Sequence, residues 1–117
     1  ERLLISDDAN EVVVPGSEGD FTVFSGHSPV LSTLRPGVLD VKLADGKSRR
    51  VFVKGGFAEV DATSLTVLAQ EAVYIADVGK DWAAQQLEAA QQELASAKDD
   101  EVRRYAHAAV EALRSLA

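Results

Sequence analysis

Residues 12–37 decide the fold, and they read VVVPGSEGDFTVFSGHSPVLSTLRPG. This stretch holds all three prolines of the chain and four of its eight glycines, set between short runs of β-branched and aromatic residues. Glycine and proline favour turns, whereas valine, threonine and phenylalanine favour strands, so the backbone is expected to reverse every few residues, as in a compact all-β layer. Glu18, Asp20 and His27 fall in or beside those reversals. They are either solvated turn residues or groups presented to a partner.

The strand pattern continues over residues 1–77. Short runs rich in Val, Leu, Ile and Phe alternate with turn formers there. Strands are expected at 2–6, 11–14, 21–24, 30–34, 39–43, 50–54, 57–60 and 65–69, with a last one within 71–75. Many short strands with no helix between them predict an antiparallel β-sandwich or flattened barrel. Because the sequence opens directly into a strand, we also expect an N-terminal strand to be missing and the sheet edge there to be open or irregular.

The composition changes in the last third of the chain. Residues 78–117 contain no proline and one glycine, and they are rich in Ala, Gln, Glu and Leu. Apolar residues recur at helical spacing in two stripes, at 83, 87, 90, 94 and 97 and at 102, 106, 109, 113 and 116. Asp99 and Asp100 lie between the stripes, and either can cap the second helix. The pattern predicts an antiparallel helical hairpin with an alanine-rich seam, and Trp82 and Tyr105 are the bulky residues expected to decide whether it docks on the sheet.

The resulting fold class is α+β. An N-terminal antiparallel β-sandwich is expected over residues 1–77, followed by a C-terminal antiparallel two-helix hairpin over residues 78–117. A length of 117 residues suits a small domain with an appendage of this kind.

The composition and the missing motifs argue against several classes of function. The net charge of −7 argues against nucleic acid or anionic lipid as the main ligand, and the densest basic group, residues 47–50, is expected to be a solvated hairpin end. No run approaches the ~20 apolar residues of a membrane-spanning helix, and there is no cysteine. His27 and His107 lack the spacing of metal ligands, and neither a nucleophile elbow nor a phosphate-binding loop is present. We therefore expect no catalytic residue, metal site, cofactor or nucleotide site.

Five motifs stand in order along the β part. They are VPGSEGDF at 14–21, GHSPVL at 26–31, LRPG at 34–37, FVKGGFAEV at 52–60 and LTVLAQEA at 65–72. In this combination the chain resembles the epsilon subunit of bacterial F-type ATP synthases, the counterpart of the mitochondrial delta subunit. The resemblance covers the β part almost completely and the helical part more loosely.

The resemblance implies a non-catalytic subunit of the central stalk, or rotor, which couples rotation of the c-subunit ring to the gamma subunit. The implied position is peripheral, on the cytoplasmic face of the inner, energy-transducing membrane, without direct membrane insertion. By position, Glu18, Gly19, Asp20 and His27 match the family's contact with the ring. The rival from another class is a free-standing β-sandwich module that binds a small ligand.

The resemblance gives the hairpin two further roles in some members, inhibition of ATP hydrolysis and ATP binding. ATP-binding members carry Ile-Asp-x-x-Arg-Ala, whereas residues 76–81 place Lys80 for Arg and Asp81 for Ala, so we expect no useful ATP binding. Arg103, Arg104 and Arg114 could contact acidic loops of the catalytic alpha and beta subunits. They could equally be solvent-face charges, which is the reading we favour.

Overall fold

The protein is described by a computed structural model that covers residues 2–5, 9–24, 30–43, 45–60, 65–69 and 71–117. Within these residues, nine strands come first, then one 3-10 turn and two α-helices. The strands are β1 Arg2–Ile5, β2 Ala9–Gly16, β3 Gly19–Phe24, β4 Val30–Leu34, β5 Gly37–Leu43, β6 Ser48–Val53, β7 Gly56–Val60, β8 Leu65–Leu68 and β9 Ala72–Tyr74. The 3-10 turn η1 spans Ile75–Asp77, and the helices are α1 Lys80–Ser96 and α2 Asp100–Arg114. The predicted α+β class is confirmed.

All strand pairs are antiparallel, and they form two layers joined at one corner. One layer has the order β3-β2-β5-β6-β9, and the other has the order β4-β7-β8-β1. The corner is the pairing of Gly16 in β2 with Leu34 in β4. Strand β1 is an edge strand of the described sheet and pairs with β8. The missing N-terminal strand stays a prediction.

The core of the sandwich comes from alternate residues of both layers, as expected for strands with one buried face. Its members are 6% exposed or less, and half-buried Phe21, Leu43, Ala72 and Tyr74 pack against them. They are Val12, Val14, Val23, Leu39, Val41, Val51 and Val53 from the first layer, Leu34, Ala58 and Val67 from the second, and Ala69 just after β8.

Most strand boundaries differ from the predicted ranges by one or two residues, and the second strand differs at both ends. The sequence predicts residues 11–14 with a stop at Pro15, whereas β2 begins at Ala9 and continues to Gly16. The register of β2 with β5 ends at Val13, so the missing N–H of Pro15 breaks no bond in that ladder. The carbonyl of Pro15 still accepts a hydrogen bond from the Arg35 N–H at 3.0 Å.

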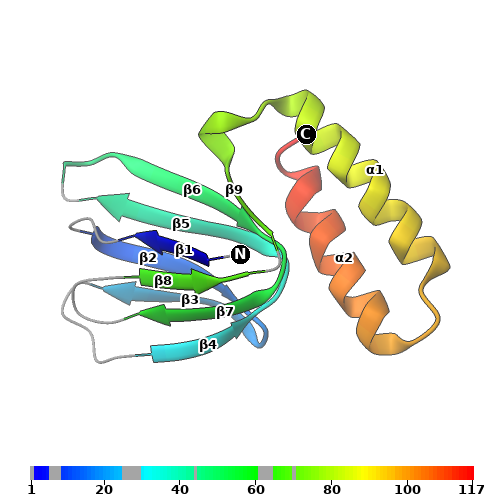
Figure 1. Cartoon of the computed structure of the whole chain (residues 1–117), viewed down its shortest axis with the longest axis horizontal. Helices are drawn as coiled ribbons and strands as arrows, with labels where there is room; N and C mark the ends of the chain where they lie inside the picture. The colour runs from blue at the N-terminus through cyan, green and yellow to red at the C-terminus, as the bar shows by residue number, and fades with distance from the viewer. Residues whose placement is uncertain (1, 6–8, 25–29, 44, 61–64, 70) are drawn as a thin grey trace.

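The two helices form the expected hairpin, and it is docked at one end of the sandwich (Figure 1). Phe52 of β6 lies 2% exposed beneath it, because its side chain points away from the sandwich core toward the helices. Trp82 packs edge-on against Phe52, with ring centroids 5.9 Å apart. Val110 and Leu113 of α2 belong to the same cluster.

Candidate functional site

The β2–β3 turn holds most of the residues predicted to contact the c-subunit ring. Gly16 and Gly19 face each other across the hairpin, so that Ser17 and Glu18 form its two-residue loop. Glu18, Gly19 and Asp20 are exposed, as predicted. No ion pair of Glu18 is found within the described part of the chain. The loop thus presents one carboxylate to solvent at the tip of a stiff ribbon.

Arg35, in the connection between β4 and β5, braces this turn. Its guanidinium donates to the Gly16 carbonyl at 2.6 Å and lies 2.5 Å from a carboxylate oxygen of Asp20. A backbone bond from the Ser17 N–H to the Thr33 carbonyl, 2.9 Å long, adds a second tie between the two turns. Asp20 is therefore engaged within the chain, and of the two predicted acids Glu18 is the one that projects freely. The sequence reasoning did not identify Arg35, although its place in the LRPG motif beside a turn was a usable signal.

His27 lies outside the described residues. Of the four residues predicted to contact the ring, the structure describes Glu18, Gly19 and Asp20, which share the β2–β3 turn. The part of His27 in this contact stays a prediction.

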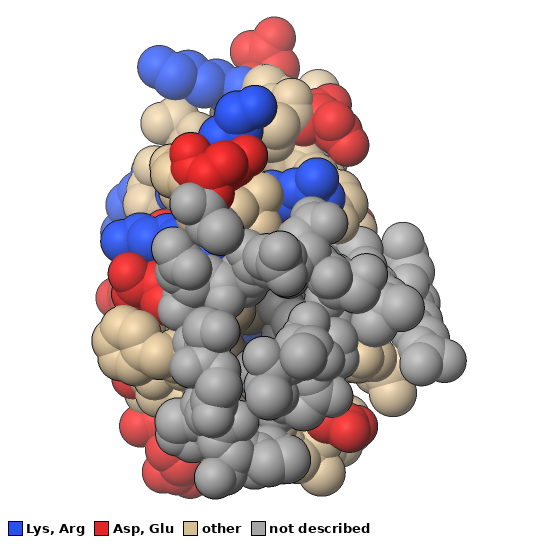
Figure 2. Space-filling view, turned by 90° about the vertical axis from the view of Figure 1, so that its left-hand side faces the viewer, with Lys and Arg blue, Asp and Glu red and all other residues tan. Residues whose placement is uncertain are grey.

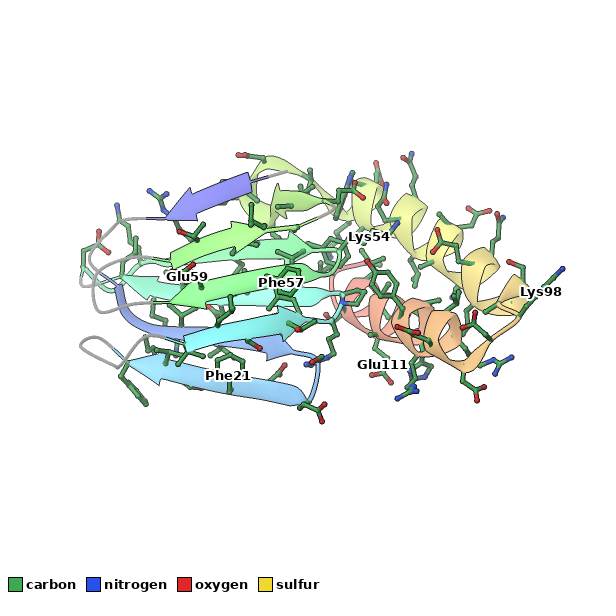
Figure 3. All side chains as sticks on the ribbon, turned by 60° about the horizontal axis from the view of Figure 1, so that its bottom comes forward. Phe21, Lys54, Phe57, Glu59, Lys98 and Glu111 are labelled. Carbon is green, nitrogen blue, oxygen red and sulfur yellow. The ribbon has the colours of Figure 1, made fainter. Side chains whose placement is uncertain are left out.

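A second surface, which sequence reasoning missed, lies on the outer face of the layer made by β4, β7 and β8. Leu31, Phe57 and Leu68 are 71%, 52% and 52% exposed, although they are large and apolar. Phe57 stands opposite Leu68 in the register of β7 with β8, and Glu59 lies on the same outer face (Figure 3). We call these three apolar residues the outer patch. Its signal in the sequence is Phe57-Ala58, where apolar residues fall on both faces of one strand.

The three arginines of α2 are exposed. Arg103 pairs with Asp100 at 2.8 Å, and Arg114 stands in the last turn, where a positive charge interacts favourably with the helix dipole. These local roles suit solvent-face charges, and contacts with catalytic subunits stay a prediction.

In the part of the chain that the structure describes, two hollows border the docked hairpin. The larger, of about 430 Å³, lies between the β2–β3 and β4–β5 turns and α2, and Asp20, Arg35 and Glu111 line it. The smaller, of about 200 Å³, is lined by Val78, Lys80 and neighbouring residues at the start of α1. Among the residues described, no three His, Asp or Glu side chains gather closely enough to hold a metal ion. In the same residues no helix is long and apolar enough to cross a membrane.

The exposed ends of the sandwich carry charges of both signs. Figure 2 looks at the end far from the hairpin, where blue and red side chains intermix on the described part of the surface. Residues 47–50 are exposed, and the Lys47 N–H donates to the Asp45 carboxylate at 2.9 Å. The basic cluster is thus a solvated hairpin end, as predicted.

Comparison with known proteins gives concordant matches. Residues 1–75 match the family described as ATP synthase, Delta/Epsilon chain, beta-sandwich domain. The ATP synthase epsilon chain of Maricaulis maris (strain MCS10) is 45% identical over 100% of this chain and 90% of its own length. The ATP synthase epsilon chain of Parvibaculum lavamentivorans is 43% identical over 99% and 88%. Among solved structures, a chain from the cryo-EM structure of the Euglena gracilis mitochondrial ATP synthase, OSCP/F1/c-ring in rotational state 1, superposes with a TM-score of 0.65 at 28% identity, covering 92% of this chain and 68% of that one.

Proposed function

This chain belongs to the ATP synthase delta/epsilon chain family, and we propose that it is the rotor subunit that couples rotation of the c-subunit ring to the gamma subunit. The chain is a non-catalytic subunit of that enzyme. The observation that carries the proposal is the match of relatives over the whole chain, hairpin included. We propose that residues 1–77 and 78–117 act as two units, with the sandwich peripheral on the cytoplasmic face of the inner membrane.

The outer patch supports gamma as the partner of the sandwich. Leu31, Phe57 and Leu68 expose apolar surface on a rigid sheet, and clustered apolar side chains of this kind are typical of protein interfaces. Because buried aromatic side chains dominate such interfaces, Phe57→Ala should weaken binding of gamma about tenfold or more. Leu43→Ala, a truncation of a half-buried side chain away from the outer patch, is the control for lost stability alone.

The β2–β3 turn supports the contact with the ring. Glu18 is exposed at the tip of a turn that Arg35 braces, so it can present a carboxylate without a cost in ordering the loop. Gly19 and Asp20 belong to the same turn. His27 remains part of the proposed contact from the resemblance alone.

Cross-linking in membranes tests both surfaces. The chain has no cysteine, so single cysteines can be placed without background. We expect Glu18→Cys to cross-link to a c subunit and Glu59→Cys to gamma, whereas Asp45→Cys, an exposed turn residue in neither surface, should give neither product. Co-purification with gamma but persistent failure of Glu18→Cys to reach the ring would overturn the ring site alone. Failure of the intact chain to co-purify with gamma and the catalytic subunits would overturn the proposed function and favour the free-standing module.

The absence of a nucleotide site stays a prediction. Lys80 is the basic side chain that lines the smaller hollow, and Asp81 follows it with a negative charge that would repel phosphates. Calorimetric titration of the intact chain with magnesium-ATP should show no binding. A dissociation constant in the micromolar range would contradict this.

A further inference from the structure

The apolar part of the docking interface leaves space on both sides. Phe52 and Val38 of the sandwich meet apolar residues of the hairpin, but the hollows of about 200 and 430 Å³ flank this contact. Both hollows are open to solvent, so they mark the rim of the apolar contact and are not voids inside it. Apolar contact alone is non-directional. Something more specific must set where the hairpin rests.

A compact polar contact supplies that specificity at Lys54, in the connection between β6 and β7 (Figure 3). The hydroxyl of Tyr105, on α2, donates to the main-chain carbonyl of Lys54. The ammonium of Lys54 lies 3.9 Å from a carboxylate oxygen of Glu93, on α1. The Lys54 N–H donates to the Glu71 carbonyl at 2.9 Å, which ties the same residue to the segment before β9. One residue of the sandwich is therefore held by both helices.

Gly55 makes room for this contact. It has φ of +83°, a left-handed conformation that favours glycine. A Cβ at this position would lie 2.7 Å from the Tyr105 hydroxyl oxygen and 2.9 Å from its ring. A side chain at position 55 would displace the ring of Tyr105 from the β6–β7 connection, so the position of this ring depends on a glycine here.

We propose that Tyr105, seated on Lys54 and Gly55, is a latch that sets the balance between the docked and the released hairpin. We call this contact the Tyr105 latch. It involves no partner subunit and operates in the isolated chain. Loss of the latch should leave the sandwich and the two helices folded and change only how often they part.

Two readouts in the intact chain report that balance. Trp82, the single tryptophan, packs on Phe52 only while the hairpin is docked, so its fluorescence reports docking. Nitroxide labels on Asp45→Cys and Lys98→Cys, both exposed and at opposite ends of the molecule, give the distance distribution directly. Both measurements are repeated at low, increasing concentrations of urea, so that a small released population can be detected.

The first test is Tyr105→Phe, which removes the hydroxyl and keeps the ring. A typical intramolecular hydrogen bond predicts a rise of about three- to tenfold in the ratio of released to docked hairpin. The matched control is Tyr74→Phe, the same change at the other tyrosine, which packs against the sandwich core. Tyr74→Phe should leave the ratio unchanged. Equal ratios in Tyr105→Phe and the unaltered chain would overturn the latch.

The second test compares two glycines with nearly the same backbone conformation. Gly46, in the β5–β6 turn, has φ of +86°, and a Cβ there would meet nothing within 4 Å. Gly55→Ala and Gly46→Ala therefore introduce similar backbone strain, but only Gly55→Ala displaces Tyr105. We expect the ratio of released to docked hairpin to rise in Gly55→Ala and to stay unchanged in Gly46→Ala. The same ratio in both variants would contradict the latch, and if Gly55→Ala fails to fold, Tyr105→Phe decides.

Discussion

At the scale of single residues, the ionisation of Tyr105 links docking to pH. Burial, then the negative charges of Glu93 and Glu71, raise the pKa of this phenol above its ordinary value of 10.0. The neutral phenol is thus favoured while the hairpin is docked. The groups that face it are Glu93 from α1, Glu71 from the segment before β9, and Lys54 from the sandwich.

The sign of the pH effect follows from linkage. A pKa that is raised in the docked state stabilises docking fully below pH 10.0, the ordinary value, and this stabilisation is lost as the pH rises through the raised pKa. We expect the docked fraction, followed by Trp82 fluorescence, to be constant from pH 7 to about pH 9 and to fall above about pH 10. The control is Tyr105→Phe, which keeps the ion pair of Lys54 with Glu93. If the alkaline loss is as steep in this variant, the phenol of Tyr105 is not its cause.

Arg35 illustrates a second residue whose role the motif alone did not reveal. It joins the β2–β3 turn to the β4–β5 connection through Gly16 and Asp20. The pair with Asp20 is partly exposed, with side chains 35% and 60% accessible, so its contribution is discounted for screening by solvent. Arg35→Ala should lower the free energy of unfolding by about 1 kcal/mol in a urea titration.

Arginine geometry gives this prediction its control. Arg35→Lys keeps the charge but cannot donate to two acceptors in the fork that Arg35 uses, so it should recover less than half of the loss. Arg104→Ala, on the exposed face of α2, should have no measurable effect. Full recovery by lysine would mean that charge alone matters at this turn.

At the scale of elements, most strands and both helices were predictable because their patterns are local. Alternation of apolar and polar residues over positions 39–43 of β5, and the spacing of alanines and leucines in α1 and α2, each indicate one element without any knowledge of its neighbours. The docking site of the hairpin was not predictable in this way. Phe52 stands in an apolar run, Val51–Val53, that is buried on both faces, and only the fold shows that helices cover one of them.

The candidate site likewise has features that follow from the local sequence and features that depend on the fold. The exposure of Glu18 followed from its place in a turn, whereas the pairing of Asp20 with Arg35 depends on two turns that the topology brings together. The outer patch was missed because periodicity predicts only that a residue faces outward. It does not predict that an exposed apolar residue lies beside another one on the neighbouring strand. Phe57 and Leu68 meet only through the register of β7 with β8.

The cap of α2 resolves an alternative that the sequence left open. The carboxylate of Asp99 accepts from the Val102 N–H at 2.8 Å, whereas Asp100 forms an exposed pair with Arg103. Asp99→Ala should therefore cost about 1 kcal/mol of unfolding free energy, and Asp100→Ala less than about 0.5 kcal/mol. Thermal or urea unfolding followed by circular dichroism measures both. A larger effect at Asp100 would mean that the helix begins one residue later in solution.

At the scale of the whole molecule, the two proposed surfaces and the Tyr105 latch lie on different parts of the chain. The β2–β3 turn lies at the same end of the sandwich as the hairpin, and the larger hollow is lined by residues of both. The outer patch lies on the other layer, made by β4, β7 and β8. Release of the hairpin would thus uncover Phe52 and the surroundings of Asp20 while it leaves the proposed gamma surface unchanged. Binding of gamma through the outer patch can then vary independently of the hairpin, whereas the proposed ring contact changes its surroundings when the hairpin is released.

This separation leads to a prediction for the assembled enzyme. If Arg103, Arg104 and Arg114 are solvent-face charges, replacing all three by alanine should leave ATP hydrolysis by the membrane-bound complex within about twofold of the unaltered enzyme, because exposed single charges contribute little. Arg103 has its partner Asp100 on the same helix, which lowers its availability to another subunit. A control that replaces Lys47 and Arg50 by alanine, exposed basic residues of the β5–β6 hairpin outside both proposed surfaces, accounts for the loss of positive charge alone. A several-fold rise in hydrolysis in the triple variant, with normal assembly, would instead assign these arginines to an inhibitory contact with the catalytic subunits.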